Sequence, residues 1–345
     1  MTAIKLEYIW VGGNNELRSK TRVVFTNKEF NLLTLEDSEI SEWNFDGSST
    51  NQADCNNSEI IIKPVSLYKD PFRNNDFHLL VLCDTWTPDN KPHKTNTRIL
   101  AKEIFDKAIE QEPWFGMEQE FFVFDNKTGL PLGFPTTGLP PEQGQYYCSV
   151  GTSNAFGREF LEEVLDNCLY AEVPITGINF EVCFGQMEIQ VCSTGIEAGD
   201  NLLIIRYILQ RTAEKYKYDI DFSSKPLKGS WNGSGCHTNF STKDMRENEN
   251  GYELILDSIS RLRKKHAEHI DCYGKDNNER LTGICETSSI STFSCGVADR
   301  GTSIRIPKST EQSGRGYFED RRPSSSCDPY LVTSKIFKTC VLDKI

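Results

Sequence analysis

The chain begins with short segments in which apolar and polar positions alternate, the pattern of half-buried strands. Residues 5–10 (KLEYIW) and 17–25 (LRSKTRVVF) flank residues 12–15 (GGNN), whose turn chemistry predicts a β-hairpin. Apolar runs at residues 58–64 (SEIIIKP) and 78–83 (HLLVLC) predict two more strands. The N-terminal part is therefore expected to be a small, strand-rich domain.

A polar stretch with two prolines, TPDNKPHKTNT at residues 87–97, interrupts this pattern. We place a domain boundary there and expect one domain in residues 1–90 and a second in residues 91–345. Beyond the boundary, apolar positions recur three and four apart, as in amphipathic helices. Such stripes lie in residues 95–111, 156–168, 198–216 and 252–269. Strand-like segments alternate with them, which predicts an α/β or α+β domain.

One connection in the second part is unusually long. Residues 131–147 are rich in Gly and Pro and show no apolar periodicity. Connections of this length are uncommon in compact domains unless they have a function. We therefore expect a binding loop there.

The composition narrows the classes of protein. A formal net charge of -12 and a pI of about 5.1 argue against general affinity for nucleic acid or anionic membranes. No apolar run has the length of a membrane span, and the first residues lack the features of a signal peptide. The 12 cysteines form no CxxC pair, which favours reduced thiols. A cytoplasmic protein is expected.

Two acidic residues interrupt a strongly apolar strand pattern at residues 115–124 (FGMEQEFFVF). Glu118 and Glu120 are two apart, so on a strand both side chains point to the same face. Ionised carboxylates among so many aromatic residues are costly unless a cation meets them. This segment therefore predicts a cation site.

Further acids stand in similar surroundings. Glu181 and Glu188 are seven apart and would face opposite ways on one straight strand, but Gly185 allows a turn that brings both inward. Glu319 precedes Arg321 by two residues, which places both on one face if the segment is extended. Any single strand glutamate more often faces water. Five of them in aromatic-rich segments favour a site for Mg²⁺ or Mn²⁺, which prefer oxygen ligands.

Basic residues add to this picture. His237 lies in a glycine-rich loop, although a lone histidine is more often structural; His266 and His269, on a charged helix, are expected to be solvated. Enzymes that transfer phosphoryl groups use arginines together with hard metal ions. Candidates for this role are Arg280, Arg300, Arg305, Arg321 and Arg322. The alternative interpretation is that these arginines form salt bridges on the surface. The chain lacks HExxH, P-loop and GxGxxG motifs, so a nucleotide would be held in a less common way.

Longer motifs then identify a family. DGSST, GMEQEF, NGSGCHTNFS, RLTGICETSSI, GVADRGTSIRIP and GYFEDRRPSSSCDPY follow one another in the order found in glutamine synthetases of the eukaryotic (type II) class. The resemblance extends over nearly the whole chain. It implies an α+β fold, with an N-terminal β-grasp domain and a C-terminal catalytic domain whose curved antiparallel sheet forms a half-barrel flanked by helices. It also implies a homo-oligomer of two stacked pentameric rings, with each active site between neighbouring subunits.

The resemblance implies two or more Mg²⁺ or Mn²⁺ ions per site and ATP as co-substrate. By the family pattern, Glu120, Glu181 and Glu188 match the ligands of one ion. Glu118, His237 and Glu319 match the ligands of the other. The implied reaction joins ammonia to L-glutamate with hydrolysis of ATP, through a γ-glutamyl phosphate intermediate.

The family pattern also assigns roles to other side chains. Asp46 matches the residue that deprotonates ammonium and that the adjacent subunit delivers, and Glu286 matches a flap glutamate that closes the site. Arg300 and Arg321 match catalytic residues that also contact the substrate. Further substrate contacts match Asn232, Gly233 and Arg280, and ATP contacts match Glu118, Glu188, Asn239, Ser241, Arg300, Arg305, Tyr317 and Phe318.

Some positions depart from the family pattern. They are Phe184, Met187, Cys192, Ser193, Cys285, Asp299 and the run from Cys55 to Glu59. Cys192 and Ser193 are expected to lie beside the nucleotide. The affinity for ATP is therefore the property that these departures are expected to alter most. The first predicted strand also begins almost at the start of the chain. Because of this short N-terminus, we expect weaker packing between subunits. Two alternatives stay open: a catalytically impaired structural or regulatory relative, and a ligase of the same superfamily that joins glutamate to a larger amine.

Overall fold

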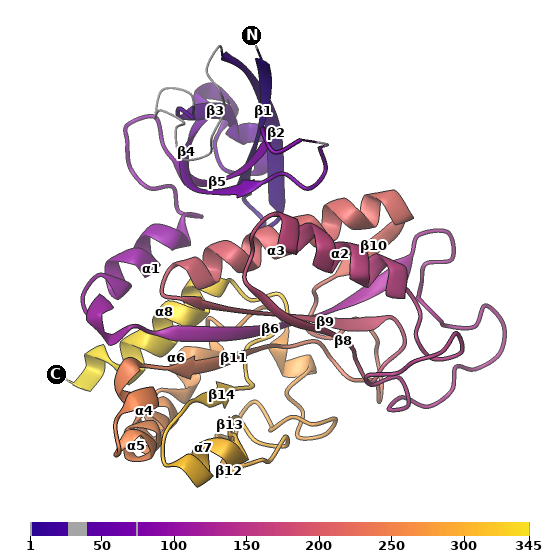
Figure 1. Ribbon diagram of the computed structural model, residues 1–345, viewed down its shortest axis with the longest axis vertical. Helices are drawn as coiled ribbons and strands as arrows, with labels where there is room; N and C mark the ends of the chain where they lie inside the picture. Colours follow the sequence, from indigo (N-terminus) through magenta and orange to yellow (C-terminus); the bar gives the residue numbers. More distant parts are fainter. Residues whose placement is uncertain (1, 27–39, 74, 345) are drawn as a thin grey trace.

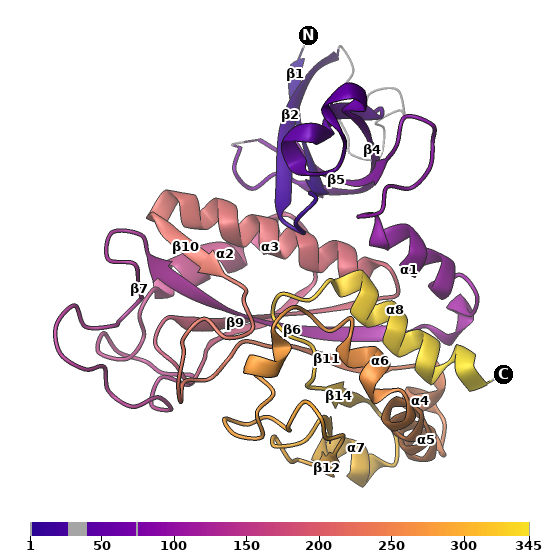
Figure 2. The same ribbon diagram turned by 180° about the vertical axis from the view of Figure 1, so that it is seen from behind.

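The computed structural model describes residues 2–26, 40–73 and 75–344, which build two β-sheets with helices around the larger one (Figures 1 and 2). The N-terminal sheet stands apart at the top of Figure 1, and the rest of the chain forms the wider body below it. Together they make the mixed α+β architecture that the sequence predicted, including the curled, half-barrel form of the larger sheet.

The N-terminal sheet has the strand order β2-β1-β5-β4-β3. Its strands are β1 (Thr2–Val11), β2 (Leu17–Thr26), β3 (Trp43–Asp46), β4 (Glu59–Lys69) and β5 (Leu79–Trp86). The predicted hairpin is confirmed, because β1 and β2 pair antiparallel across Gly12 and its neighbours. Alternate β1 residues, Ile4, Leu6, Tyr8 and Trp10, build the core of this sheet, as the two-residue period requires. Ile9 on the other face joins the core of the larger, C-terminal part of the chain.

The second sheet carries the acidic residues. Its main path is β12-β13-β14-β11-β6-β9-β8, with β7 and β10 also paired to β6. The strands are β6 (Trp114–Asp125), β7 (Leu130–Pro131), β8 (Ile175–Phe180), β9 (Gln186–Thr194), β10 (Tyr218–Asp221), β11 (Cys236–Ser241), β12 (Cys295–Val297), β13 (Ile304–Ile306) and β14 (Phe318–Asp320). All of these pairs are antiparallel except β12 with β13.

Helices cover one face of this sheet, with α2 and α3 between the sheet and the N-terminal domain (Figure 1). The helices are α1 (Thr97–Phe105), α2 (Arg158–Tyr170), α3 (Glu197–Tyr216), α4 (Lys243–Glu247), α5 (Gly251–Lys264), α6 (His266–Ile270), α7 (Lys308–Ser313) and α8 (Pro329–Cys340). On β6, Phe115, Met117 and Phe121 pack into this helical core. Residues of even number, among them Glu118 and Glu120, therefore point to the opposite face. None of the described helices combines the length and apolarity needed to cross a membrane.

Two sequence expectations for residues 252–269 are wrong. The stripe at residues 252–269 breaks at Lys265 into α5 and α6, and His269 is buried rather than solvated. Its ring bonds with the Tyr273 hydroxyl at 2.6 Å and the Thr339 hydroxyl at 2.9 Å. Burial, followed by the charge of Arg322, lowers the pKa of His269 to about 3. The half-buried His266 contacts Arg322 at 3.0 Å. Both histidines are therefore structural. The boundary at residue 90 stays a prediction.

Candidate active site

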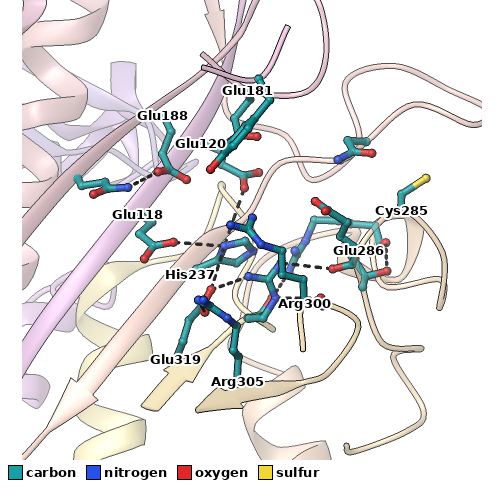
Figure 3. Close-up of a pocket in the computed structure, with 17 residues that line it drawn as sticks. Glu118, Glu120, Glu181, Glu188, His237, Cys285, Glu286, Arg300, Arg305 and Glu319 are labelled. Carbon is teal, nitrogen blue, oxygen red and sulfur yellow. Dashed lines mark hydrogen bonds and ion pairs between the residues drawn. The ribbon is translucent and has the colours of Figure 1, made fainter. Parts of the chain in front are cut away.

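A cavity of ≈ 150 Å³ opens on the face of the large sheet that the helices leave free (Figure 3). Most of the predicted site residues line it: Glu118, Glu120, Glu181, Glu188, Asn232, Gly233, His237, Arg280, Glu286, Arg300, Arg305, Glu319 and Arg321. They come from β6, β9, β11, β13, β14 and the loops between strands. Segments far apart in the sequence thus meet at one polar cavity.

Glu120, Glu181 and Glu188 meet on one side of the cavity, with one carboxylate oxygen from each lying within 4.8 Å of the others. Glu120 and Glu188 are direct partners across β6 and β9. Glu181 reaches them because the chain turns between β8 and β9, at Gly185 with a φ of 63°. A Cβ at Gly185 would lie 2.7 Å from the Leu132 nitrogen, so only glycine fits there. The predicted turn is confirmed.

These three carboxyls lie in an environment that disfavours three negative charges. Burial, and after it the neighbouring Glu181, raises the pKa of Glu120 to about 8. Burial and Glu188 raise the pKa of Glu181 to about 8, and burial with Glu118 and Glu120 does the same for Glu188. A cation bound among them would relieve this repulsion and favour the ionised forms.

Glu118, His237 and Glu319 form the second group, also with ligand atoms within 4.8 Å. Strands β6 and β11 place Glu118 directly opposite His237, whose Nδ1 lies 3.6 Å from Glu118 Oε2 and 3.5 Å from Glu319 Oε1. Burial, and after it Arg321, lowers the pKa of His237. The ring is therefore neutral at pH 7, the form that ligates metals.

The donor set fits hard divalent ions. The two groups together offer five carboxylates and one imidazole, with no thiolate. Such oxygen-rich sets suit Mg²⁺ and Mn²⁺ better than zinc or copper.

Arginines face the two acidic groups across the cavity (Figure 3). Arg321 Nη1 donates to Glu319 Oε1 at 2.6 Å, and Arg305 Nη1 donates to Glu319 Oε2 at 2.8 Å. Arg321 Nη2 also donates to the Glu286 carbonyl at 3.4 Å. Arg300 is more exposed and stands over the Tyr147 ring, 5.9 Å from its centroid. The cavity thus has an acidic wall and a basic wall.

Arg280 is buried behind the loop that carries Asn232 and Gly233. Its Nη2 donates to the carbonyls of Arg321, Arg322 and Pro323 at 2.7 to 3.0 Å, and burial lowers its pKa to about 10. A Cβ at Gly233 would lie 2.6 Å from Arg280 Cγ. The glycine therefore lets this loop pack directly on the arginine side chain.

A second, more apolar cavity of ≈ 370 Å³ lies on the other side of Asn239. Asn239 joins the two cavities, because it lines the second and its Nδ2 donates to Glu118 Oε1 at 2.8 Å. The predicted nucleotide contacts Ser241 and Tyr317 also line the second cavity. The Phe318 side chain instead lies in the core against Phe240.

Two positions that depart from the family pattern lie on opposite faces of β9. Cys192 lines the second cavity. Ser193 points away from it, and its Oγ accepts a hydrogen bond from Asn201 Nδ2 at 2.8 Å. Phe184 is buried against Phe134 and Tyr146 of the loop at residues 131–147, and Met187 is buried in the core, so both are packing residues.

Asp46 lies outside the cavity within this chain, at the end of β3 in the N-terminal domain. Its carboxylate accepts hydrogen bonds from the Ser48 backbone and hydroxyl and from the Ser49 hydroxyl. These bonds lower the pKa of Asp46 to about 2. The exposed carboxylate is therefore ionised at neutral pH.

Sequence reasoning did not single out several residues of the site. Gln190, Tyr147 and Thr287 line the first cavity. Gln190 follows Glu188 by two residues on the same strand face and donates to its Oε1 at 2.5 Å, so strand periodicity could have found it. Tyr147 is the last residue of the loop that was expected to bind a ligand, whereas Thr287 carries no comparable signal, because loop geometry brings it in.

Comparison with known proteins agrees with this arrangement. Residues 94–342 match the family model described as glutamine synthetase, catalytic domain, and residues 4–88 match that of the glutamine synthetase beta-Grasp domain. A glutamine synthetase of Agaricus bisporus is 49% identical over 99% of this chain and 94% of its own length. A glutamine synthetase cytosolic isozyme of Medicago sativa is 49% identical over 98% of this chain and 94% of its own length. A chloroplastic glutamine synthetase of Oryza sativa is 48% identical over 97% of this chain and 78% of its own length.

Proposed function

This chain belongs to the glutamine synthetase family, and from that premise we propose that it is a glutamate–ammonia ligase. The proposed reaction converts L-glutamate, ammonia and ATP to L-glutamine, ADP and phosphate. One observation supports this proposal most: two acidic groups and several arginines line the same polar cavity. An apolar cavity suited to a nucleotide base lies beside it.

The acidic groups would hold two divalent ions in this mechanism. Glu120, Glu181 and Glu188 would be the ligands of one, and Glu118, His237 and Glu319 would be those of the other, because each group brings its ligand atoms within 4.8 Å of one another. When bound, such ions neutralise the phosphates of ATP and polarise the phosphoryl oxygens. The family relationship favours Mg²⁺ or Mn²⁺ in both places.

The first step transfers the γ-phosphoryl group of ATP to the side-chain carboxylate of glutamate, which gives γ-glutamyl phosphate and ADP. A free carboxylate is a poor acyl donor, and this transfer activates it. Arg321 and Arg305, already held by Glu319, present guanidinium N–H groups to the charge that develops on the phosphoryl oxygens. Arg300 supplies a third cation at the mouth of the cavity.

The second step needs ammonia and the exclusion of water. Ammonium is attracted to an acidic site, loses a proton to a carboxylate and attacks the acyl phosphate, which releases phosphate. The ionised carboxylate of Asp46 suits this role, although it lies outside the cavity of its own chain. We therefore infer that Asp46 serves the site of a neighbouring subunit, in a homo-oligomer of two stacked pentameric rings. Glu286 lies on the exposed rim of the cavity, where a closing flap would need it.

A cytoplasmic location is proposed with this function. It rests on the relatives, one of which is named a cytosolic isozyme, whereas another is named chloroplastic. The acidic composition agrees with a protein that binds neither nucleic acid nor anionic membranes.

The proposal is tested by phosphate release from Mg-ATP with the purified protein and glutamate, in the presence of ammonium, ethylamine or neither. Release that requires glutamate and is fastest with ammonium is the expected result. Faster release with ethylamine would identify a ligase for larger amines. Absence of release under all three conditions, from folded protein that binds Mn²⁺, would identify a catalytically inactive relative.

A further inference from the structure

The loop at residues 131–147 contacts the segment that carries Asn232 through the side chains of Gln143 and Phe134, and Gln143 makes the hydrogen bonds. The backbone N–H of Asn232 donates to Gln143 Oε1 at 2.8 Å, and Gln143 Nε2 donates to Asn232 Oδ1 at 2.8 Å. Nε2 also lies 3.3 Å from the Ser230 carbonyl, to which it donates. The two residues therefore form a reciprocal pair of hydrogen bonds at the edge of the first cavity.

The loop that presents Gln143 is itself fixed to the protein. The Gly144 N–H donates to the Val182 carbonyl at 2.7 Å, directly beside Glu181. The Tyr146 ring packs on Phe184 at 3.9 Å between centroids, and Phe134 contacts both Phe184 and Trp231 at 5.2 and 5.5 Å. These contacts hold the loop in place, and they therefore fix the position from which the Gln143 side chain reaches Asn232.

The pair also fixes the polarity of the Asn232 amide. A backbone N–H can only donate, so Gln143 must turn its Oε1 toward it. Gln143 Nε2 then needs an acceptor, which is Asn232 Oδ1. As a result Asn232 keeps Nδ2, a donor, for whatever enters the cavity that it lines. A donor suits a carboxylate, whereas a flipped amide would present its oxygen to the same negative group.

We propose that Gln143 is a positioning residue that orients Asn232 so that its amide N–H groups receive a carboxylate of the substrate glutamate. This inference rests on the proposed function. It adds a residue that acts on the substrate through Asn232 and does not touch the substrate itself. It also gives the long loop a function, which is to set the polarity of the substrate pocket.

The test compares two substitutions at Gln143. Gln143→Ala removes both hydrogen bonds. Gln143→Glu keeps the acceptor for the Asn232 N–H but loses the donor, so the Asn232 amide is expected to flip. Each variant should raise the KM for glutamate roughly 10-fold, the cost of one to two hydrogen bonds, while the KM for ATP changes less than about 2-fold.

Gln145 provides the matched control on the same loop. It is exposed, and its Nε2 bonds with the Tyr146 hydroxyl at 2.9 Å rather than with the Asn232 segment. Gln145→Glu adds the same charge and should leave both KM values within about 2-fold of the wild type. A plain structural role for Gln143 would make the Glu variant clearly milder than the Ala variant.

The outcomes separate this inference from the proposed function. A wild-type protein that makes no glutamine counts against the function. An active wild type with an unchanged glutamate KM in Gln143→Glu overturns the role of Gln143. Equal increases in the KM values for glutamate and ATP, or a lowered melting temperature in both Gln143 variants, would also overturn it, because these results indicate general damage.

Discussion

At the scale of single residues, Glu188 combines most of the features that define the site. It pairs directly with Glu120 across two strands, accepts a hydrogen bond from Gln190 and has a pKa raised by burial and by neighbouring carboxylates. A residue under such repulsion is destabilising by itself and is favourable only with a counter-ion. Its place in the structure therefore argues for a bound cation.

This argument predicts the effect of Glu188→Gln. The variant should bind Mn²⁺ at the Glu120 side more weakly by at least about 10-fold, because even residues behind a metal ligand cost that much. Mn²⁺ titration followed by EPR or calorimetry measures the change. Glu253→Gln, on the exposed surface of α5, is the control and should bind as the wild type does. Equal Mn²⁺ affinity in both variants would contradict the assignment of Glu188 as a ligand.

Residue-level prediction from sequence succeeded where strand periodicity applied. The two-residue spacing placed Glu118 and Glu120 on one face, and both line the cavity. It failed for His269, because the charges around it suggested a solvated helix, whereas its ring faces Tyr273 and Thr339. Periodicity shows which positions share a face but not which face the rest of the chain will cover.

At the scale of elements, the turn between β8 and β9 decides whether the first acidic group can form. Gly185 adopts a left-handed φ of 63° and lies against the backbone of Leu132 and Val123. The backbone on that side belongs to the start of the long loop and to the central strand β6. Neither can move without disturbing the sheet, so the turn admits glycine only.

Gly185→Ala should therefore lower the free energy of unfolding by about 1–3 kcal/mol and weaken Mn²⁺ binding. Gly129→Ala is the matched control, since Gly129 has a similar φ of 67° but open space where a Cβ would be added. Chemical denaturation gives the free energy of unfolding of each variant. Both variants include the cost of backbone strain, so a larger loss in Gly185→Ala measures the steric conflict. The account is contradicted if the two substitutions cost the same.

Some helices and strands were predicted correctly from the sequence, and others were not. The hairpin of β1 and β2 and the helix α3 were expected from turn chemistry and from a long apolar stripe, and both are present. The end of α5 at Lys264 was missed, because the stripe continues through the break into α6. The role of Gln143 was invisible to sequence reasoning, because its partner Asn232 lies far along the chain and only the folded loop brings them together.

At the scale of the whole molecule, a buried ionic cluster joins the two parts of the chain. Asp84 of β5 lies 4.0 Å from Arg98 of α1, and Arg98 bonds with Asp200 of α3 at 2.7 and 2.8 Å. Asp200 thereby holds the arginine, whereas the contact of Asp84 with the same arginine is longer. Burial raises the pKa of Asp84 to about 6.

Asp84 should therefore make stability depend on pH. The folded state binds the proton of Asp84 more tightly than the unfolded chain does, so stability falls as pH rises from about 4 through about 6 and then levels off. Asp84→Asn removes this cost and should stabilise the protein at pH 8 by up to about 3 kcal/mol, with no gain near pH 4. Melting temperatures measured against pH, beside those of the exposed control Asp54→Asn, test this. A gain that persists at pH 4 would contradict it.

A second whole-molecule prediction concerns the site between subunits. If Asp46 serves a neighbouring chain, Asp46→Ala and Glu188→Gln should each be inactive alone but should complement each other. Random mixed oligomers would contain about a quarter of their sites with an intact Asp46 facing an intact Glu188. Activity after dissociation and reassembly of the mixture measures this. An inactive mixture that has formed mixed oligomers would place Asp46 in the site of its own chain or outside the mechanism.

The fold was the most predictable property, because several long motifs and both domain patterns agreed on one architecture. The sequence did not predict the structural effect of the residues that depart from the family pattern. Phe184 packs under the long loop, Met187 lies in the core and Ser193 faces Asn201. Cys192 lines the apolar cavity and Cys285 lines the polar one. Side-chain direction decides these cases, and it follows from tertiary packing.

The central claim is that this site forms an amide from ammonia and glutamate at the expense of ATP. The most direct test supplies ¹⁵N-ammonium, glutamate and Mg-ATP to the purified protein and follows the products by NMR. The account predicts glutamine labelled at its side-chain amide, in equal amount to the ADP released. ADP without labelled glutamine, or neither product from folded protein with Mn²⁺ bound, would contradict it.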